Sequence, residues 1–410
     1  MKIGSSSLHS RTAASTCAFC VAGVLALGPV AAAAPAGTDP GAPGGSRAAA
    51  SPASLLYRPG THVRPRAGSP AVPDVSALSW VVADADSGAV LAAHDAHRRL
   101  PPASTLKTLF ALTVLPSLPA GLRHRVREEE LSGIGAGSSM VGVAEDNTYR
   151  VSDLWRGVFL SSGNDAVHVL ASLNGGWRTT TARMQAKARA LGARDTHVRS
   201  PDGYDAPGQV SSAYDLAVFG RAGLHNADFA RYCGTVEAMF PGRGGGSYGI
   251  RNTNRLLTGS DGVERYPGLI GVKNGYTTQA GHTLVSAARR DGRTLVVTVM
   301  NPQAGGSLTV YEEARSLLDW GFDAADRVEP VGSLDAFRAR PVTGPQASPV
   351  AAPAAGPTAA GPVASAAAAA PAGSGPDWPK GLAIAGATAL GAGITALVTR
   401  RAARRWATGG

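Results

Sequence analysis

The sequence predicts an α+β fold, in which an antiparallel sheet is flanked by helices and a separate, all-helical lobe is inserted into the chain. Three observations lead to this prediction. A hairpin pattern stands near the start of the apolar region, helical patterns occupy much of residues 150–225, and a second hairpin pattern with an amphipathic helix ends the region. Strands at both ends with helices between them favour a sheet closed by the first and last segments.

The first hairpin consists of the apolar runs 79–84 and 89–93, which flank the turn sequence Asp86-Ser87-Gly88. A helix is expected over residues 104–114, because Pro101 and Pro102 directly precede it and proline is favoured before or within the first helical turn.

The second hairpin is predicted from residues 283–288 and 294–300, which flank Asp291-Gly292. An amphipathic helix over residues 311–320 follows it. These segments complete the predicted sheet.

The periodic apolar sequence lies between residues 75 and 326, and roughly 250 residues suffice for one large domain or one domain of two lobes. Residues 37–74 are rich in Pro, Gly, Ala and Ser and are expected to be disordered. Residues 327–379 are expected to form a low-complexity linker.

The N-terminus has the pattern of a secretory signal peptide at residues 1–36. Lys2 and Arg11 precede the apolar stretch 16–30, and a run of small residues follows it. Cleavage between Ala33 and Ala36 is expected.

Removal of that segment leaves one cysteine. Cys17 and Cys20 lie within the signal peptide, and Cys233 is the third of the three cysteines. The exported protein is therefore expected to have no internal disulfide.

The C-terminus predicts a transmembrane helix at residues 380–399 and a basic cytoplasmic tail at 400–410. Residues 381–399 carry no charge, and as a helix they reach about 28 Å, close to the hydrocarbon thickness of a bilayer. Because positive residues stay on the cytoplasmic side, the expected location is the cell membrane, with a single pass and the folded domain outside the cell.

The 39 Lys and Arg residues exceed the 29 Asp and Glu residues, which gives a formal net charge of +10. Anionic wall polymers are a weak expectation, and a concentration of basic residues at the membrane end explains the charge more simply. No arginine-rich arm with interleaved aromatic residues occurs, so no nucleic-acid partner is expected. The nine histidines are dispersed, so no metal or cofactor is expected; His94 and His97 are predicted to lie on the surface at a strand end.

The first motif with chemical meaning is Ser104-Thr105-Leu106-Lys107. Residues three apart on a helix share a face, so the Ser104 hydroxyl and the Lys107 amine can meet there. The amine can act as a base only if burial or a nearby cation lowers its pKa. Alone, this spacing usually means a solvated helix face.

Two further motifs follow in order. Ser162-Gly163-Asn164 interrupts two helical patterns and is expected on a tight turn, although an ordinary helix boundary would have the same sequence. Lys273-Asn274-Gly275 is expected on a strand over residues 269–277. Asn-Gly is also a common hairpin turn, but no paired apolar run begins before about Thr283.

The three motifs together match the set S-x-x-K, S-x-N and K-T-G of penicillin-binding proteins and class A β-lactamases. Residues 79–322 resemble the serine D-alanyl-D-alanine carboxypeptidases, the low-molecular-mass penicillin-binding proteins. Further similar stretches are 100–104 (LPPAS), 200–204 (SPDGY), 252–257 (NTNRLL) and 317–322 (LLDWGF).

The resemblance implies a transpeptidase-like fold, β-lactams as inhibitors, and removal of the terminal D-alanine from peptidoglycan stem peptides through an acyl-enzyme. It assigns Ser104 as nucleophile and Lys107 as base. It assigns Ser162 and Lys273 to the relay of a proton to the leaving amine, and the charge of Lys273 helps to keep Lys107 neutral.

The resemblance also implies the groups that bind substrate. Asn164 holds the backbone amide of the substrate. The backbone N–H groups of Ser104 and of Tyr276, the residue after Gly275, form the oxyanion hole. Asn274 stands in the position whose side chain binds the terminal carboxylate.

Two positions depart from the family pattern. Asn274 replaces a threonine, and Val310 occupies the place of an arginine that aids carboxylate binding in relatives. Loss of one or two charge-assisted hydrogen bonds, at about 1.5–3 kcal/mol each, motivates the alternative of a weakly active or non-catalytic wall protein. A β-lactamase is a less favoured alternative, because no Glu-x-x-Leu-Asn occurs between Ser162 and Lys273.

Overall fold

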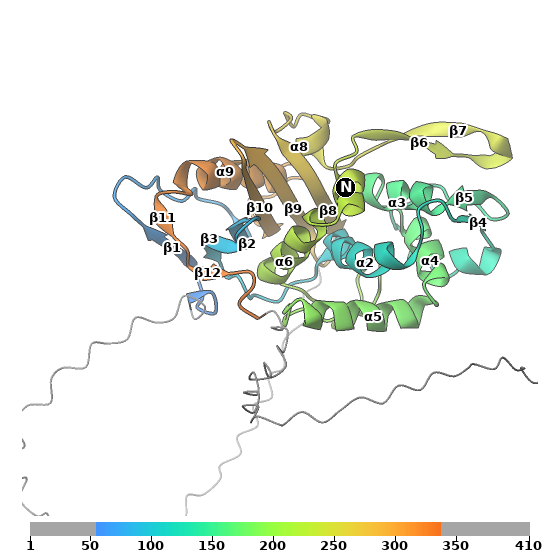
Figure 1. The fold of residues 1–410 in the computed structure, drawn as a ribbon, viewed down its shortest axis with the longest axis horizontal. Helices are drawn as coiled ribbons and strands as arrows, with labels where there is room; N and C mark the ends of the chain where they lie inside the picture. The colour runs from blue at the N-terminus through green and yellow to red at the C-terminus, as the bar shows by residue number, and fades with distance from the viewer. Residues whose placement is uncertain (1–54, 338–410) are drawn as a thin grey trace, which may run out of the picture. The chain divides into compact units, whose positions relative to one another are not determined.

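The central strands carry buried apolar residues on both faces, so both faces need a cover. They are β2 (Ala77–Asp84), β9 (Gly281–Arg290) and β10 (Arg293–Pro302). The computed structural model describes residues 55–337 and places these strands within an antiparallel sheet of order β11-β1-β3-β2-β10-β9-β8, with β12 paired to β3 (Figure 1). Because successive side chains point to opposite faces, neighbouring residues of β10 enter separate hydrophobic cores.

The other strands of this sheet are β1 (Thr61–Pro65), β3 (Ala89–His94), β8 (Leu269–Thr277), β11 (Val328–Glu329) and β12 (Gly332–Ser333). Two small sheets are formed by β4 (Arg123–Arg125) with β5 (Thr148–Arg150), and by β6 (Glu237–Pro241) with β7 (Ser247–Arg251). The α-helices are α2 (Lys107–Val114), α3 (Val151–Leu160), α4 (Asn164–Leu173), α5 (Trp177–Ala190), α6 (Ala213–Leu224), α7 (Ala227–Cys233), α8 (Arg255–Thr258) and α9 (Thr309–Ala324). Short 3-10 turns are η1 (Ala103–Leu106), η2 (Leu115–Ser117), η3 (Glu128–Leu131) and η4 (Arg243–Gly245).

Helices cover both faces of the sheet. Helix α9 packs on β2, β9 and β10 from one side, and α6 packs on the same three strands from the other. Helices α2, α3, α4 and α5 form a lobe beyond α6, as Figure 1 shows. The predicted α+β architecture, with both hairpins, the helices of 150–225 and the last helix, is therefore confirmed.

The folded domain begins earlier than predicted. The expectation that residues 37–74 are disordered is wrong for 55–74, because β1 pairs with β3 on one side and β11 on the other. A polar segment of this kind gains order by adding backbone hydrogen bonds to an existing sheet edge. Leu56, which is 2% exposed, joins the hydrophobic core.

The folded domain also ends later than predicted. The expected linker 327–379 is wrong for 327–337, where β11 pairs with β1 and β12 pairs with β3. Val331 and Leu334 are buried between and after these strands. Two short strands are too brief to give a clear periodic pattern in the sequence.

The predicted signal peptide 1–36, transmembrane helix 380–399 and tail 400–410 lie outside the described residues. Between residues 55 and 337, none of the helices has the length and apolar character that a membrane crossing requires.

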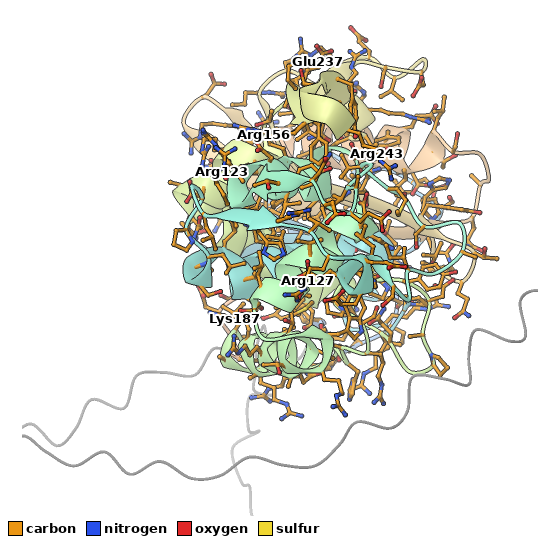
Figure 2. The ribbon with its side chains drawn as sticks, turned by 90° about the vertical axis from the view of Figure 1, so that its right-hand side faces the viewer. Arg123, Arg127, Arg156, Lys187, Glu237 and Arg243 are labelled. Atoms are coloured by element: carbon orange, nitrogen blue, oxygen red, sulfur yellow. The ribbon has the colours of Figure 1, made fainter. Side chains whose placement is uncertain are left out.

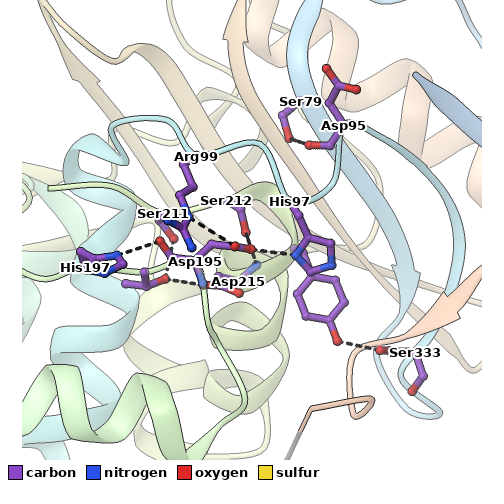
Figure 3. Close-up of polar contacts among 12 residues, drawn as sticks. Ser79, Asp95, His97, Arg99, Asp195, His197, Ser211, Ser212, Asp215 and Ser333 are labelled. Atoms are coloured by element: carbon purple, nitrogen blue, oxygen red, sulfur yellow. Dashed lines mark hydrogen bonds and ion pairs between the residues drawn. The ribbon is translucent and has the colours of Figure 1, made fainter. Parts of the chain in front are cut away.

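The predicted surface position of His97 is wrong. Its side chain is 8% exposed, and Nδ1 lies 2.7 Å from Asp195 Oδ2. Figure 3 shows His97 directed at Asp195. Tyr57 stacks on the imidazole at 4.0 Å between ring centroids. Tyr57 belongs to the segment 55–74, which the sequence predicted to be disordered, so the burial of His97 could not be predicted either. His94, by contrast, is partly exposed.

Basic side chains are not confined to the C-terminal end of the chain. Figure 2 shows Arg123, Arg127, Arg156 and Lys187 on the outer surface of the helical lobe. Arg127 and Arg156 have acidic partners three residues or fewer away. Their charges are therefore partly balanced locally.

Helix α9 approaches the sheet most closely at Gly321. A Cβ atom there would lie 2.8 Å from Leu295 Cδ1 and 2.9 Å from Val82 Cγ1, two side chains that are fully buried. Overpacking of a core costs about 1–3 kcal/mol, which exceeds the gain of at most about 1 kcal/mol in helix propensity from Gly to Ala.

We expect Gly321→Ala to lower the free energy of unfolding by about 1 kcal/mol, measured by urea denaturation. The control is Ser316→Ala, at an exposed position of the same helix. Equal stability of Gly321→Ala and the wild type would show that the contact between helix and sheet has room for a methyl group.

Candidate active site

The first motif lies where a 3-10 turn becomes a helix. Ser104 is in η1, and Lys107 begins α2. Lys107 Nζ lies 2.6 Å from Ser104 Oγ. The structure thus brings together the hydroxyl and the amine, as their spacing predicts.

The Lys107 amine is removed from water. Its side chain is fully buried, and Nζ donates a second hydrogen bond, of 2.7 Å, to the carbonyl oxygen of Asp202. Burial lowers the pKa of Lys107 to about 8, while the carboxylates of Asp202 and Asp165 oppose the shift. About one-tenth of this amine is therefore uncharged at pH 7, and that fraction can accept a proton.

A second buried lysine lies close by. Lys273, on β8, is 1% exposed, and its Nζ donates to the backbone carbonyl of Asn274 at 2.8 Å. Burial holds the pKa of Lys273 well below its usual value, and the charge of Lys107 lowers it further. Two ammonium groups in one dry site disfavour each other, so the site favours at most one charge on the pair.

The second motif forms the tight turn between α3 and α4. Ser162 adopts the left-handed backbone region with φ 57°, a conformation that costs a non-glycine residue energy. Its buried hydroxyl makes no hydrogen bond among the described residues, so the structure does not join it to Lys273. Asn164 is buried, and its Nδ2 donates to Ser138 Oγ at 3.0 Å.

The third motif lies on β8, the terminal strand of the sheet. A Cβ atom on Gly275 would lie 2.6 Å from the backbone nitrogen of Ser104, so only glycine lets the strand pass the nucleophile this closely. Tyr276 is 61% exposed and lies against His282 of β9.

Asn274 faces a polar group of residues to which the sequence analysis gave no role. Thr253 Oγ1 donates to Asn274 Oδ1 at 3.0 Å, and the Tyr311 hydroxyl also lies within reach of the Asn274 side chain. The Arg255 guanidinium lies 5.7 Å from the centre of the Tyr311 ring. Val310, in the place of the missing arginine, is buried in α9. Arg255 lies in the family-like stretch NTNRLL, but the sequence did not indicate a role for it.

The segment 202–205 closes the other side of the nucleophile. Gly203 has φ 81°, and a Cβ atom there would lie 2.0 Å from the carbonyl oxygen of Ala103. Asp202 is buried and accepts hydrogen bonds from Ser200 Oγ and the Tyr204 N–H, which shape the turn. The stretch SPDGY was recognisable as family-like, but its contact with η1 depends on the fold.

These segments enclose a cavity of about 200 Å³ that contains Ser104. It is lined by Ser104, Ala136, Gly137, Ser138, Ser139, Asn164, Gly203, Tyr204, Asp205, Tyr276, Thr277 and Thr278. Within residues 55–337, no group of three or more His, Cys, Asp or Glu side chains is placed to bind a metal ion. The site presents a hydroxyl, a buried amine and backbone N–H groups, a set suited to acyl transfer.

The comparisons with known proteins agree with this geometry. A family model described as D-alanyl-D-alanine carboxypeptidase matches residues 66–304. D-alanyl-D-alanine carboxypeptidase DacB2 of Mycobacterium tuberculosis is 42% identical over 271 residues, which are 65% of this chain and 89% of that protein.

Solved structures show the same fold. The crystal structure of a D-alanyl-D-alanine carboxypeptidase from Mycobacterium tuberculosis is 40% identical and has a TM-score of 0.60, covering 66% of this chain and 100% of that one. Penicillin binding protein 6B from Escherichia coli is 32% identical, with a TM-score of 0.56 over 64% of this chain and 82% of that one. The chain therefore belongs to the D-alanyl-D-alanine carboxypeptidase family of serine hydrolases.

Proposed function

We propose that the protein removes the terminal D-alanine from peptidoglycan stem peptides, with Ser104 as the nucleophile of an acyl-enzyme mechanism. The observation that supports this most strongly is the 2.6 Å contact between Ser104 Oγ and the buried Lys107 amine, whose pKa is lowered to about 8. A serine becomes a nucleophile when an adjacent base takes its proton, and this amine is adjacent and largely desolvated.

In acylation, Ser104 Oγ bonds to the carbonyl carbon between the two D-alanines while its proton passes to Lys107. The backbone N–H groups of Ser104 and Tyr276 stabilise the negative oxygen. A proton then reaches the leaving amine by way of Ser162 and Lys273, and the C–N bond breaks. Water then bonds to the ester carbon while its proton passes through Lys107 to Ser104 Oγ, the bond between that carbon and Ser104 Oγ breaks, and the shortened stem leaves as a carboxylic acid.

We assign substrate binding to the third motif and the lobe. Asn164 holds the peptide amide of the substrate, and Gly275 lets the substrate backbone approach Ser104. The terminal carboxylate lies beside Asn274 and takes its positive partner from Arg255. This arginine supplies a cation next to Tyr311 and lowers the pKa of His282, after burial, which is the larger cause.

A weakly active wall protein is the second candidate, and the buried Val310 favours it because α9 offers no cation at that point. A β-lactamase is a third, less favoured candidate. We further propose that the signal peptide 1–36 exports the protein and that residues 380–399 anchor it in the cell membrane with the enzyme domain outside.

We expect Ser104→Ala to abolish covalent labelling by a fluorescent penicillin and the loss of one alanine from a pentapeptide stem, both followed by mass spectrometry. The reason is that no other hydroxyl touches the Lys107 amine among the described residues. Ser316→Ala, which changes an exposed serine, is the control. Persistent labelling of Ser104→Ala, or rapid repeated hydrolysis of nitrocefin by the wild type, would contradict the proposed enzyme.

The rate of penicillin acylation is expected to rise with pH and to level off above about pH 8. Only the uncharged amine can accept the serine proton, so the rate follows the deprotonated fraction of Lys107, about tenfold per pH unit below its pKa. Stopped-flow acylation rates measure this, with melting temperatures at each pH as the control for unfolding. A flat or falling profile through this range would argue against Lys107 as the base.

We expect Arg255→Gln to lower kcat/KM for a D-Ala-D-Ala peptide about tenfold to hundredfold, the size of a charge-assisted hydrogen bond. The loss should be far smaller for the same peptide with a C-terminal amide. Arg251→Gln, at an exposed arginine on β7, is the matched control. An equal loss for both peptides would mean that Arg255 acts on the fold rather than on the carboxylate.

A further inference from the structure

One carboxylate lies in the cavity of the nucleophile and has no role in the steps above. Among the residues that line this cavity, Asp205 is the only one with a charged side chain. The two lysines of the site lie beneath the surface and do not line the cavity. A ligand in the cavity therefore meets one formal negative charge at its wall.

The Asp205 carboxylate is held in a fixed orientation. Thr277 Oγ1 donates to Oδ1 at 2.6 Å, and the backbone N–H of Gln279 donates to Oδ2 at 3.2 Å. Thr277 Oγ1 is itself held by the backbone N–H of Ala280. No lysine, arginine or histidine within residues 55–337 forms an ion pair with Asp205.

Both carboxylate oxygens therefore keep acceptor capacity after the contacts with the protein. Each carboxylate oxygen has two lone pairs, and each accepts one hydrogen bond here. The side chain is partly buried, so water screens it less than an exposed carboxylate. An incoming cation would meet an oriented and unneutralised partner.

Strand β8 determines which part of a substrate reaches Asp205. Among the described strands it is the last of the sheet and pairs only with β9, so none of them occupies its other edge, where a peptide could add as a strand along the nucleophile. With the substrate carboxylate beside Asn274, the peptide runs antiparallel to β8 and its N-terminal part points toward Thr277. The third residue from the C-terminus is two residues, or about 7 Å, further along the strand, which places it near Tyr276 and Thr277 and beside Asp205.

We infer that Asp205 selects stem peptides whose third residue from the C-terminus has a positively charged side chain, that is, a diamino acid with a free side-chain amine. The inference rests on the proposed function, because that function sets the direction of the peptide in the cleft. Asp205 is then a specificity-determining residue, and its carboxylate makes a charge-assisted hydrogen bond to the ammonium group. A purely structural role, as a tie between residues 202–205 and the end of β8, predicts no dependence on that amine.

The test compares two peptides that differ only at this amine, Nα-acetyl-L-Lys-D-Ala-D-Ala and Nα,Nε-diacetyl-L-Lys-D-Ala-D-Ala. We expect wild-type kcat/KM to be about tenfold or more higher for the free amine, mainly through KM, and Asp205→Asn to bring the ratio close to one. Asp205→Glu should retain the preference. Asp323→Asn, at an exposed carboxylate of α9, is the matched control and should keep the wild-type ratio.

The outcomes separate the two proposals. Equal cleavage of both peptides by the wild type, or an unchanged ratio in Asp205→Asn, overturns the inference and leaves the proposed function in place. Cleavage of neither peptide overturns both. Should Asp205→Asn not fold, the ratio of kcat/KM for the two peptides is measured with the wild type at increasing salt. An ion pair predicts that the preference for the free amine falls as the salt screens it, and a ratio that does not change with salt overturns the inference.

Discussion

The structure depends on the burial of one amine beside one hydroxyl. A lysine in water is charged at neutral pH and cannot serve as a base, so Lys107 needs a site that water does not reach. Its side chain is fully buried, and its Nζ contacts Ser104 Oγ and the carbonyl oxygen of Asp202.

The dry pocket is made by close backbone contacts that larger residues would prevent. Gly275 brings β8 against the Ser104 nitrogen, and Gly203 brings the 202–205 segment against Ala103. Ala103 itself has φ 49°, an unfavourable backbone conformation for alanine. Such strain is tolerated where the packing of the surrounding structure holds the backbone in place. Here it places Ser104 between β8 and the segment 202–205.

Charge is distributed along the cleft in a way that matches a zwitterionic peptide. Arg255 lies at the Asn274 end, where an anionic carboxylate is proposed. Asp205 lies further along, beside Thr277. A peptide with a C-terminal carboxylate and an ammonium group two residues earlier is complementary to Arg255 and Asp205 at once. In the reversed orientation, its ammonium group would face Arg255 and its carboxylate would face Asp205, and both contacts would be repulsive.

The amino-acid sequence alone determined the α+β class, the two hairpins and the three motifs, because these depend on local periodicity, turn chemistry and short spacing. The pairing of Ser104 with Lys107 was predictable for the same reason, since three residues make about one helical turn. The sequence gives the order of motifs that lie far apart in the chain but not their contacts, and among the described residues the Ser162 hydroxyl makes no hydrogen bond to Lys273.

Tertiary structure alone decided the rest, because those features arise from segments distant in the chain. Strands β1, β11 and β12 are ordered by pairing with an existing sheet, so composition predicted disorder for 55–74 and a linker for 327–337. His97 is buried because Tyr57 covers it. Asp205 carries no local signal, and Arg255 lies in a family-like stretch that gives it no role. Their positions at the two ends of the cleft depend on how distant segments pack around β8.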